Sequence, residues 1–66
     1  MDAKVIAVKL RELRGDIPRE TVCKALGISE SALAMYETGQ RIPRDSIKMQ
    51  IAKFYGKSVQ SIFFNP

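Results

Sequence analysis

The basic side chains that follow Gly39 are the residues best suited to binding chemistry in this 66-residue sequence. The chain carries 11 lysines and arginines against 7 aspartates and glutamates, a net charge of +4. Residues 1–40 hold equal numbers of both signs. The whole excess therefore lies in residues 41–66, at Arg41, Arg44, Lys48, Lys53 and Lys57 against Asp45 alone. Such a cluster favours a polyanion such as nucleic acid as partner. A solvated surface that only aids solubility is the alternative.

The residue types that most catalytic sites need are missing from the sequence. There is no histidine and only one cysteine, Cys23, so neither a zinc site nor histidine acid–base catalysis can be assembled. The sequence also offers no nucleophile–base pair, no paired carboxylates and no glycine loop for phosphates. We therefore expect that the protein is not an enzyme and has no cofactor, metal or small-molecule ligand.

Cysteine usage and hydropathy indicate a cellular location. A lone cysteine cannot form an intramolecular disulfide, which is typical of a reducing compartment. The longest apolar run covers only residues 32–36, far below the roughly 18 residues of a membrane span. No signal-peptide pattern follows Met1. We expect a cytoplasmic protein without a membrane partner.

Four glycines divide the chain into helical segments. Gly15, Gly27, Gly39 and Gly56 each follow apolar residues at helical spacing, and glycine is the usual residue just beyond a helix end. Working back from these glycines predicts helices over residues 3–14, 17–26, 29–38, 43–55 and 58–63. The fold class is therefore all-α, a compact five-helix domain that spans residues 1–66.

The predicted helix starts have recognisable first residues. Ser29 and Ser58 stand where N-caps of the third and fifth helices are expected. Pro43 suits the first turn of the fourth helix, because proline lacks the N–H group that would be unpaired there. The second helix has Asp16 as a plausible cap and Pro18 in its first turn.

The connection between the second and third helices is very short. Only Gly27 and Ile28 separate them ahead of Ser29, so the two helices must cross steeply, as in a helix-turn-helix. Cys23 supplies a small residue where the third helix crosses the second. Apolar residues face the crossing at Val22, Leu26, Ile28, Leu33 and Tyr36. A plain antiparallel helix pair in a small bundle is the alternative.

Two motifs carry a family resemblance. Residues 26–29 (LGIS) and 36–43 (YETGQRIP) resemble the Cro- and λ-repressor-like helix-turn-helix family, also called xenobiotic-response-element-like regulators. The resemblance covers about residues 5–64. It implies a prokaryotic or phage transcriptional repressor that binds a palindromic operator in double-stranded DNA as a homodimer. The third helix would lie in the major groove, and the second would cross the DNA backbone.

The resemblance also implies roles for individual residues. Base-reading positions map to the third helix, where Ala32 is a further candidate for contact with a thymine methyl: Glu30, Ser31, Ala34 and Met35. Phosphate-binding positions map to the start of the second helix, the third-helix cap and the segment after Gly39: Arg19, Ser29, Arg41, Arg44 and Lys48. The acidic Glu37 would pair with an arginine of the first helix, Arg14 in the first instance and Arg11 in the second.

The third helix departs from the usual composition of a reading helix. No arginine, lysine, glutamine or asparagine lies between Ser29 and Thr38, and these types make the best paired hydrogen bonds to guanine and adenine. Glu30 could accept from cytosine N4 or select against wrong sequences. Alternatively, it only complements the dipole of its own helix. A protein-interaction module or antitoxin-like adaptor on the same fold is the alternative function.

Overall fold

The computed structural model describes residues 1–64 and is entirely helical over that range. The elements are α1 (Ala3–Arg14), α2 (Arg19–Leu26), α3 (Glu30–Glu37), α4 (Asp45–Tyr55) and a short π-helix, η1 (Gln60–Phe64). The predicted all-α, five-helix class is confirmed. The last two residues of the expected domain, 65–66, lie outside the described part of the chain.

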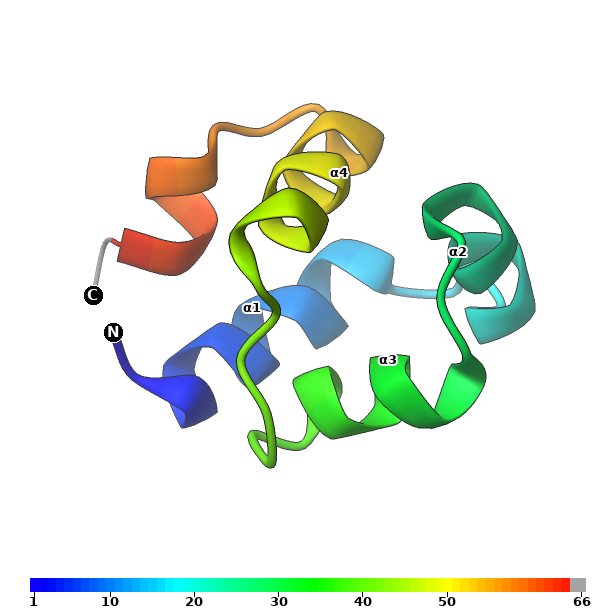
Figure 1. Ribbon diagram of the computed structural model, residues 1–66, viewed down its shortest axis with the longest axis horizontal. Coiled ribbons are helices and arrows are strands. Elements are labelled where there is room, and N and C mark those ends of the chain that lie inside the picture. The colour runs from blue at the N-terminus through cyan, green and yellow to red at the C-terminus, as the bar shows by residue number, and fades with distance from the viewer. Residues whose placement is uncertain (65–66) are drawn as a thin grey trace.

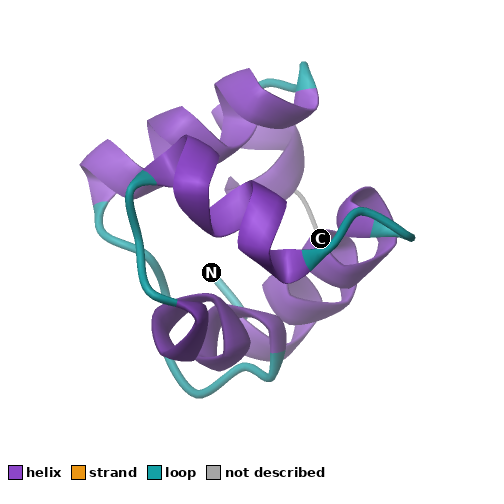
Figure 2. Ribbon diagram, turned by 90° about the vertical axis from the view of Figure 1, so that its right-hand side faces the viewer, coloured by secondary structure: helices purple, strands orange, loops and turns teal. Residues whose placement is uncertain are grey.

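The helices pack around one core (Figures 1 and 2). α1 contacts both α3 and η1, while α2 lies at one side of the molecule and contacts α3 and α4. The buried apolar side chains come from all five helices: Ile6, Leu10, Val22, Cys23, Leu26, Leu33, Tyr36, Ile47, Ile51, Ala52, Ile62 and Phe63. Cys23 and Tyr36 are therefore core residues. None of the helices within residues 1–64 is long and apolar enough to cross a membrane.

Local capping explains most of the helix boundaries. The Ser29 hydroxyl accepts a 3.0 Å hydrogen bond from the Ala32 N–H group, and Ser58 accepts one of the same length from Ser61. Both predicted caps are therefore confirmed. The final helix nevertheless begins at Gln60 and runs to Phe64, somewhat later than the 58–63 expected.

The starts of α2 and α4 differ from the prediction. Pro18 is the N-cap of α2, in an extended conformation and without a side-chain hydrogen bond, so Asp16 does not cap this helix. Arg44 is the N-cap of α4, again without a side-chain bond. Pro43 therefore lies before the helix, where its ring is fully buried. Each proline fixes the extended chain that enters a helix, instead of forming its first turn.

Candidate nucleic-acid interface

The turn between α2 and α3 has the sharp geometry of a helix-turn-helix. Gly27 adopts a left-handed conformation with φ 68° and ψ 34°, and its backbone N–H donates to the Cys23 carbonyl. The Ile28 N–H group donates to the same carbonyl at 3.1 Å. These bonds close the end of α2, and only residues 27–29 separate it from the start of α3.

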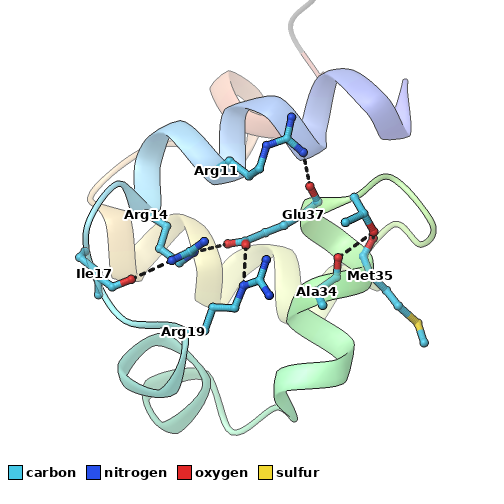
Figure 3. Close-up of polar contacts among 8 residues, drawn as sticks. Arg11, Arg14, Ile17, Arg19, Ala34, Met35 and Glu37 are labelled. Carbon is cyan, nitrogen blue, oxygen red and sulfur yellow. Dashed lines mark hydrogen bonds and ion pairs between the residues drawn. The ribbon is translucent and has the colours of Figure 1, made fainter.

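The helix α3 has one face in the core and one face in solvent. Leu33, Tyr36 and Glu37 are buried against the other helices. Glu30 and Ser31 are exposed, while Ala34 and Met35 are half-buried. Figure 3 shows the Met35 side chain directed away from the arginines that surround Glu37. The predicted base-reading residues thus occur on the accessible part of α3, and Ala32 packs against the core instead.

A buried carboxylate fixes the orientation of α3. Glu37 has no exposure to solvent, and its two oxygens accept from Arg14 Nε at 2.7 Å and from Arg19 Nε at 3.2 Å (Figure 3). Arg14 Nη1 also donates to the Ile17 carbonyl at 3.0 Å. The Arg14–Glu37 pair implied by the family resemblance is present. Arg11 donates to the Glu37 backbone carbonyl and not to its carboxylate.

The charges of this cluster reinforce each other. The hydrogen bond to Glu37 raises the pKa of the Arg14 guanidinium above its ordinary value, so the contact favours the cationic form of Arg14. A buried ion pair is costly to break from one side, because the remaining charge loses its partner in a poorly solvated place. The cluster therefore ties α3 to both α1 and the start of α2.

Arg19 has an internal partner that the sequence did not reveal. It was expected to contact a phosphate, and its side chain remains 40% exposed, but its Nε–H group is bound to Glu37. The missing signal is geometric: Arg19 and Glu37 lie 18 positions apart on helices whose crossing angle the sequence does not specify. Charge alone does not distinguish Arg19 from the other basic residues as a partner for Glu37.

Arg41 and Arg44 lie next to the helix-turn-helix. Both are exposed in the segment between α3 and α4, and together with Gly27 and Ile28 they line a depression on the surface. The two cations thus flank the turn that leads into α3. Ser29, a third expected phosphate ligand, is exposed at the same end of α3, although its hydroxyl is already engaged in the helix cap.

Lys48 does not belong to this cationic group. Its side chain is only 9% exposed and lies 3.4 Å from Asp45, within the same helix. Its ammonium also lies over the rings of Phe63 and Phe64, at 5.9 and 5.4 Å from their centroids. Burial at the α4–η1 contact argues against the expected phosphate contact, because Lys48 would have to leave these neighbours to reach DNA.

The sequence analysis assigned no role to two polar side chains at the end of α3. Thr38 donates to the Ala34 carbonyl at 2.8 Å, and Gln40 donates to the Thr38 hydroxyl at 3.1 Å. Both side chains are exposed. They extend the polar surface of α3 toward Arg41, where the sequence indicated only a helix end.

Comparison with known proteins agrees with this geometry. A helix-turn-helix family model matches residues 9–62, which include the whole of α2, α3 and α4. No curated protein and no solved structure matched the chain. The family consists of regulators that bind double-stranded DNA. The chain therefore belongs to the Cro- and λ-repressor-like helix-turn-helix family of DNA-binding regulators.

Proposed function

We propose that this protein is a sequence-specific transcriptional repressor that places α3 in the major groove of operator DNA. The observation that carries the proposal is the two-sided environment of α3. Its inner face is fixed by core packing and by the Glu37 ion pairs, whereas Glu30 and Ser31 face solvent. A major groove admits one α-helix, and a helix whose backbone is held rigidly can present its side chains to base edges reproducibly.

Basic side chains near both ends of α2 support this docking. Arg19 begins α2, and Arg41 and Arg44 lie beside the turn that follows it. Basic side chains at these places would fix the register of α3 on the duplex. They would also supply most of the affinity, because cations that neutralise phosphates release condensed counterions. The N terminus of α3, at Ser29, would also bind a phosphate through its backbone N–H groups.

Base recognition would then depend on few side chains. Glu30 can accept from cytosine N4, Ser31 can bond to several base edges, and Ala34 and Met35 offer apolar contact to a thymine methyl. A carboxylate at the front of the reading helix disfavours sequences that provide it with no donor. Specificity in this protein would therefore come partly from exclusion of wrong bases.

A homodimer on a palindromic operator completes the proposal. One α3 reads only a few base pairs, and two-fold pairing of protomers repeats that contact one helical turn away on the same side of the duplex. The protein would carry out this function in the cytoplasm as a single domain without a cofactor or a catalytic activity.

Two measurements test the proposed function. Selection of bound sequences from a random DNA pool should yield a palindrome whose half-sites are about 10 base pairs apart, centre to centre. Titration of the wild-type protein with a selected duplex should show an association constant that falls steeply as salt rises. Enrichment of no sequence, together with binding that does not depend on salt, would contradict the proposal.

A protein-interaction module or antitoxin-like adaptor is the second candidate. The observation that favours it is the composition of the accessible part of α3, where Ala34 and Met35 offer small and adaptable surfaces suited to helix packing. Co-purification of a stoichiometric protein partner, without salt-sensitive retention on heparin or DNA resin, would select this candidate instead.

A further inference from the structure

We propose that the buried carboxylate of Glu37 is a positioning residue for DNA binding, which holds the Arg19 guanidinium so that its outer edge meets a phosphate of the DNA backbone. This inference rests on the proposed function, because it concerns how the start of α2 engages the duplex. It adds a role for a side chain that is itself fully buried and therefore cannot touch DNA.

The two arginines bound to Glu37 differ in what they leave available. Arg14 uses Nε for Glu37 and Nη1 for the Ile17 carbonyl, and its side chain is only 18% exposed. Within residues 1–64, Nε is the only side-chain nitrogen of Arg19 that donates a hydrogen bond, and the side chain is 40% exposed. The terminal nitrogens of Arg19 therefore remain free to donate to a ligand from solvent, whereas Arg14 is an internal partner.

The charge of the cluster favours an anion as that ligand. Two guanidinium groups and one carboxylate leave a net charge of +1, and this charge reaches solvent through Arg19. A phosphate placed there would complete an alternating series of charges that runs from Arg14 through Glu37 and Arg19 to the phosphate. Each neighbouring pair in that series is of opposite sign, so every contact is attractive.

Fixing the guanidinium in advance reduces the entropy lost on binding. An arginine side chain loses substantial rotamer freedom when it is immobilised, and a residue that is already held loses less of it on association. The planar guanidinium can bond Glu37 with one edge and a phosphate with another, because its five N–H donors have a fixed geometry. A lysine at this position has a single ammonium group and would have to divide it between both anions.

The surroundings of Arg19 also suit a phosphate. It is the first residue of α2, whose N-cap, Pro18, provides no side-chain hydrogen bond. The Thr21 N–H group of that first turn donates to the Pro18 carbonyl, and Glu20 is paired with Lys24. The backbone N–H groups of Arg19 and Glu20 add partial positive charge beside the guanidinium. This second observation agrees with the free edge of Arg19 in indicating an anion at the start of α2.

Arginine-to-lysine exchange separates a positioned guanidinium from a simple surface charge. The probe is a duplex of mixed sequence, titrated by fluorescence anisotropy with wild type, Arg19→Ala and Arg19→Lys. We expect both variants to bind roughly tenfold more weakly and to lower the salt slope by about 0.9 per protomer. Lys53→Ala is the control. Lys53 is an exposed cation on α4 that is not among the proposed DNA contacts, so we expect near wild-type binding. Wild-type binding by Arg19→Lys would overturn the inference.

A double-mutant cycle tests the part played by Glu37. Glu37→Gln is made in the wild-type chain and in the Arg19→Ala chain, and binding is measured below the melting temperature of every variant. We expect Glu37→Gln to weaken binding several-fold in the wild-type chain and to have no further effect in the Arg19→Ala chain. An equal loss in both chains would show a general structural role and would overturn the inference. If Glu37→Gln does not fold, the lysine exchange decides alone.

The outcomes keep this inference separate from the proposed function. Absence of salt-dependent DNA binding by the wild-type protein would contradict both. Salt-dependent binding by wild type, with Arg19→Lys equal to it, would leave the proposed function intact and overturn only the positioning role of Glu37.

Discussion

The Glu37 carboxylate lies 2.7 Å from Arg14 Nε and has no exposure to solvent, so a buried ion pair joins α3 to α1. This pair connects the stability of the protein to the placement of α3. The carboxylate also binds Arg19 at the start of α2. One side chain therefore coordinates three helices.

Removal of the Glu37 carboxylate should be strongly destabilising. Glu37→Ala leaves the mostly buried guanidinium of Arg14 without its anion, and breaking a buried pair from one side costs about 3–5 kcal/mol. Urea denaturation followed by circular dichroism measures this loss. The matched control is Glu20→Ala, which removes an exposed pair with Lys24 within α2 and should cost less than about 1 kcal/mol. Equal effects of the two variants would refute the structural role of Glu37.

Arg41 and Arg44 should contribute to DNA affinity without regard to sequence. The Arg41→Ala, Arg44→Ala double variant loses two of the proposed phosphate ligands, so its salt slope should fall by about 1.8 per protomer. Its affinity for a selected operator and for a mixed-sequence duplex should fall by similar factors. Lys48→Met is the control, because Lys48 is buried beside Phe63, and we expect its DNA binding to be unchanged. Undiminished binding by the double variant would disprove the proposed docking.

Glu30 should determine base preference and not overall affinity. In Glu30→Ala, selection from a random DNA pool should show relaxed preference at one position of each half-site, because the acceptor for cytosine N4 is lost. Binding to a mixed-sequence duplex should be maintained or become tighter. If Glu30 serves only the dipole of α3, the variant will lose about 0.3–1 kcal/mol of stability and select the same sequence as wild type.

Alkaline pH should destabilise the protein through Cys23. Burial raises the pKa of this thiol above its ordinary value of 9.0. Above that pH the unfolded chain releases the proton while the folded chain keeps it, so the folded state binds more protons and the free energy of unfolding falls as pH rises. Urea denaturation across this range should show a decline that is shallower in Cys23→Ala. Burial likewise raises the pKa of Tyr55 above 10.0, so some decline should remain at higher pH. Parallel declines in both proteins would exclude Cys23 as the cause.

Much of the fold follows from local sequence patterns. Apolar residues three and four positions apart, a glycine after each helical segment and serine caps at Ser29 and Ser58 involve neighbours within about two helical turns. Such signals do not depend on the rest of the chain, and they gave the five helices and the helix-turn-helix correctly. The helix starts after Pro18 and Pro43 were placed too early, since each proline stabilises the extended chain before the helix as well as a first turn.

How well the exposure of a side chain could be predicted depended on whether contacts between distant helices affect it. Glu30 and Ser31 are exposed as expected, because a helix with buried Leu33 and Tyr36 must turn its other face outward. Lys48 was expected to face DNA, but the path of η1 places Phe63 and Phe64 over its ammonium group. Positive charge in the sequence specifies neither the side of α4 that it occupies nor what covers it.

The sequence alone determined the helical fold class, the sharp turn at Gly27 and the surplus of positive charge after residue 40, because each depends on residue type and near neighbours. Only the tertiary structure decided that Arg19 shares Glu37 with Arg14 and that Lys48 is withdrawn from the surface. These relationships join helices that are distant in sequence. They depend on crossing angles set by the packing of the whole core, which no local pattern specifies.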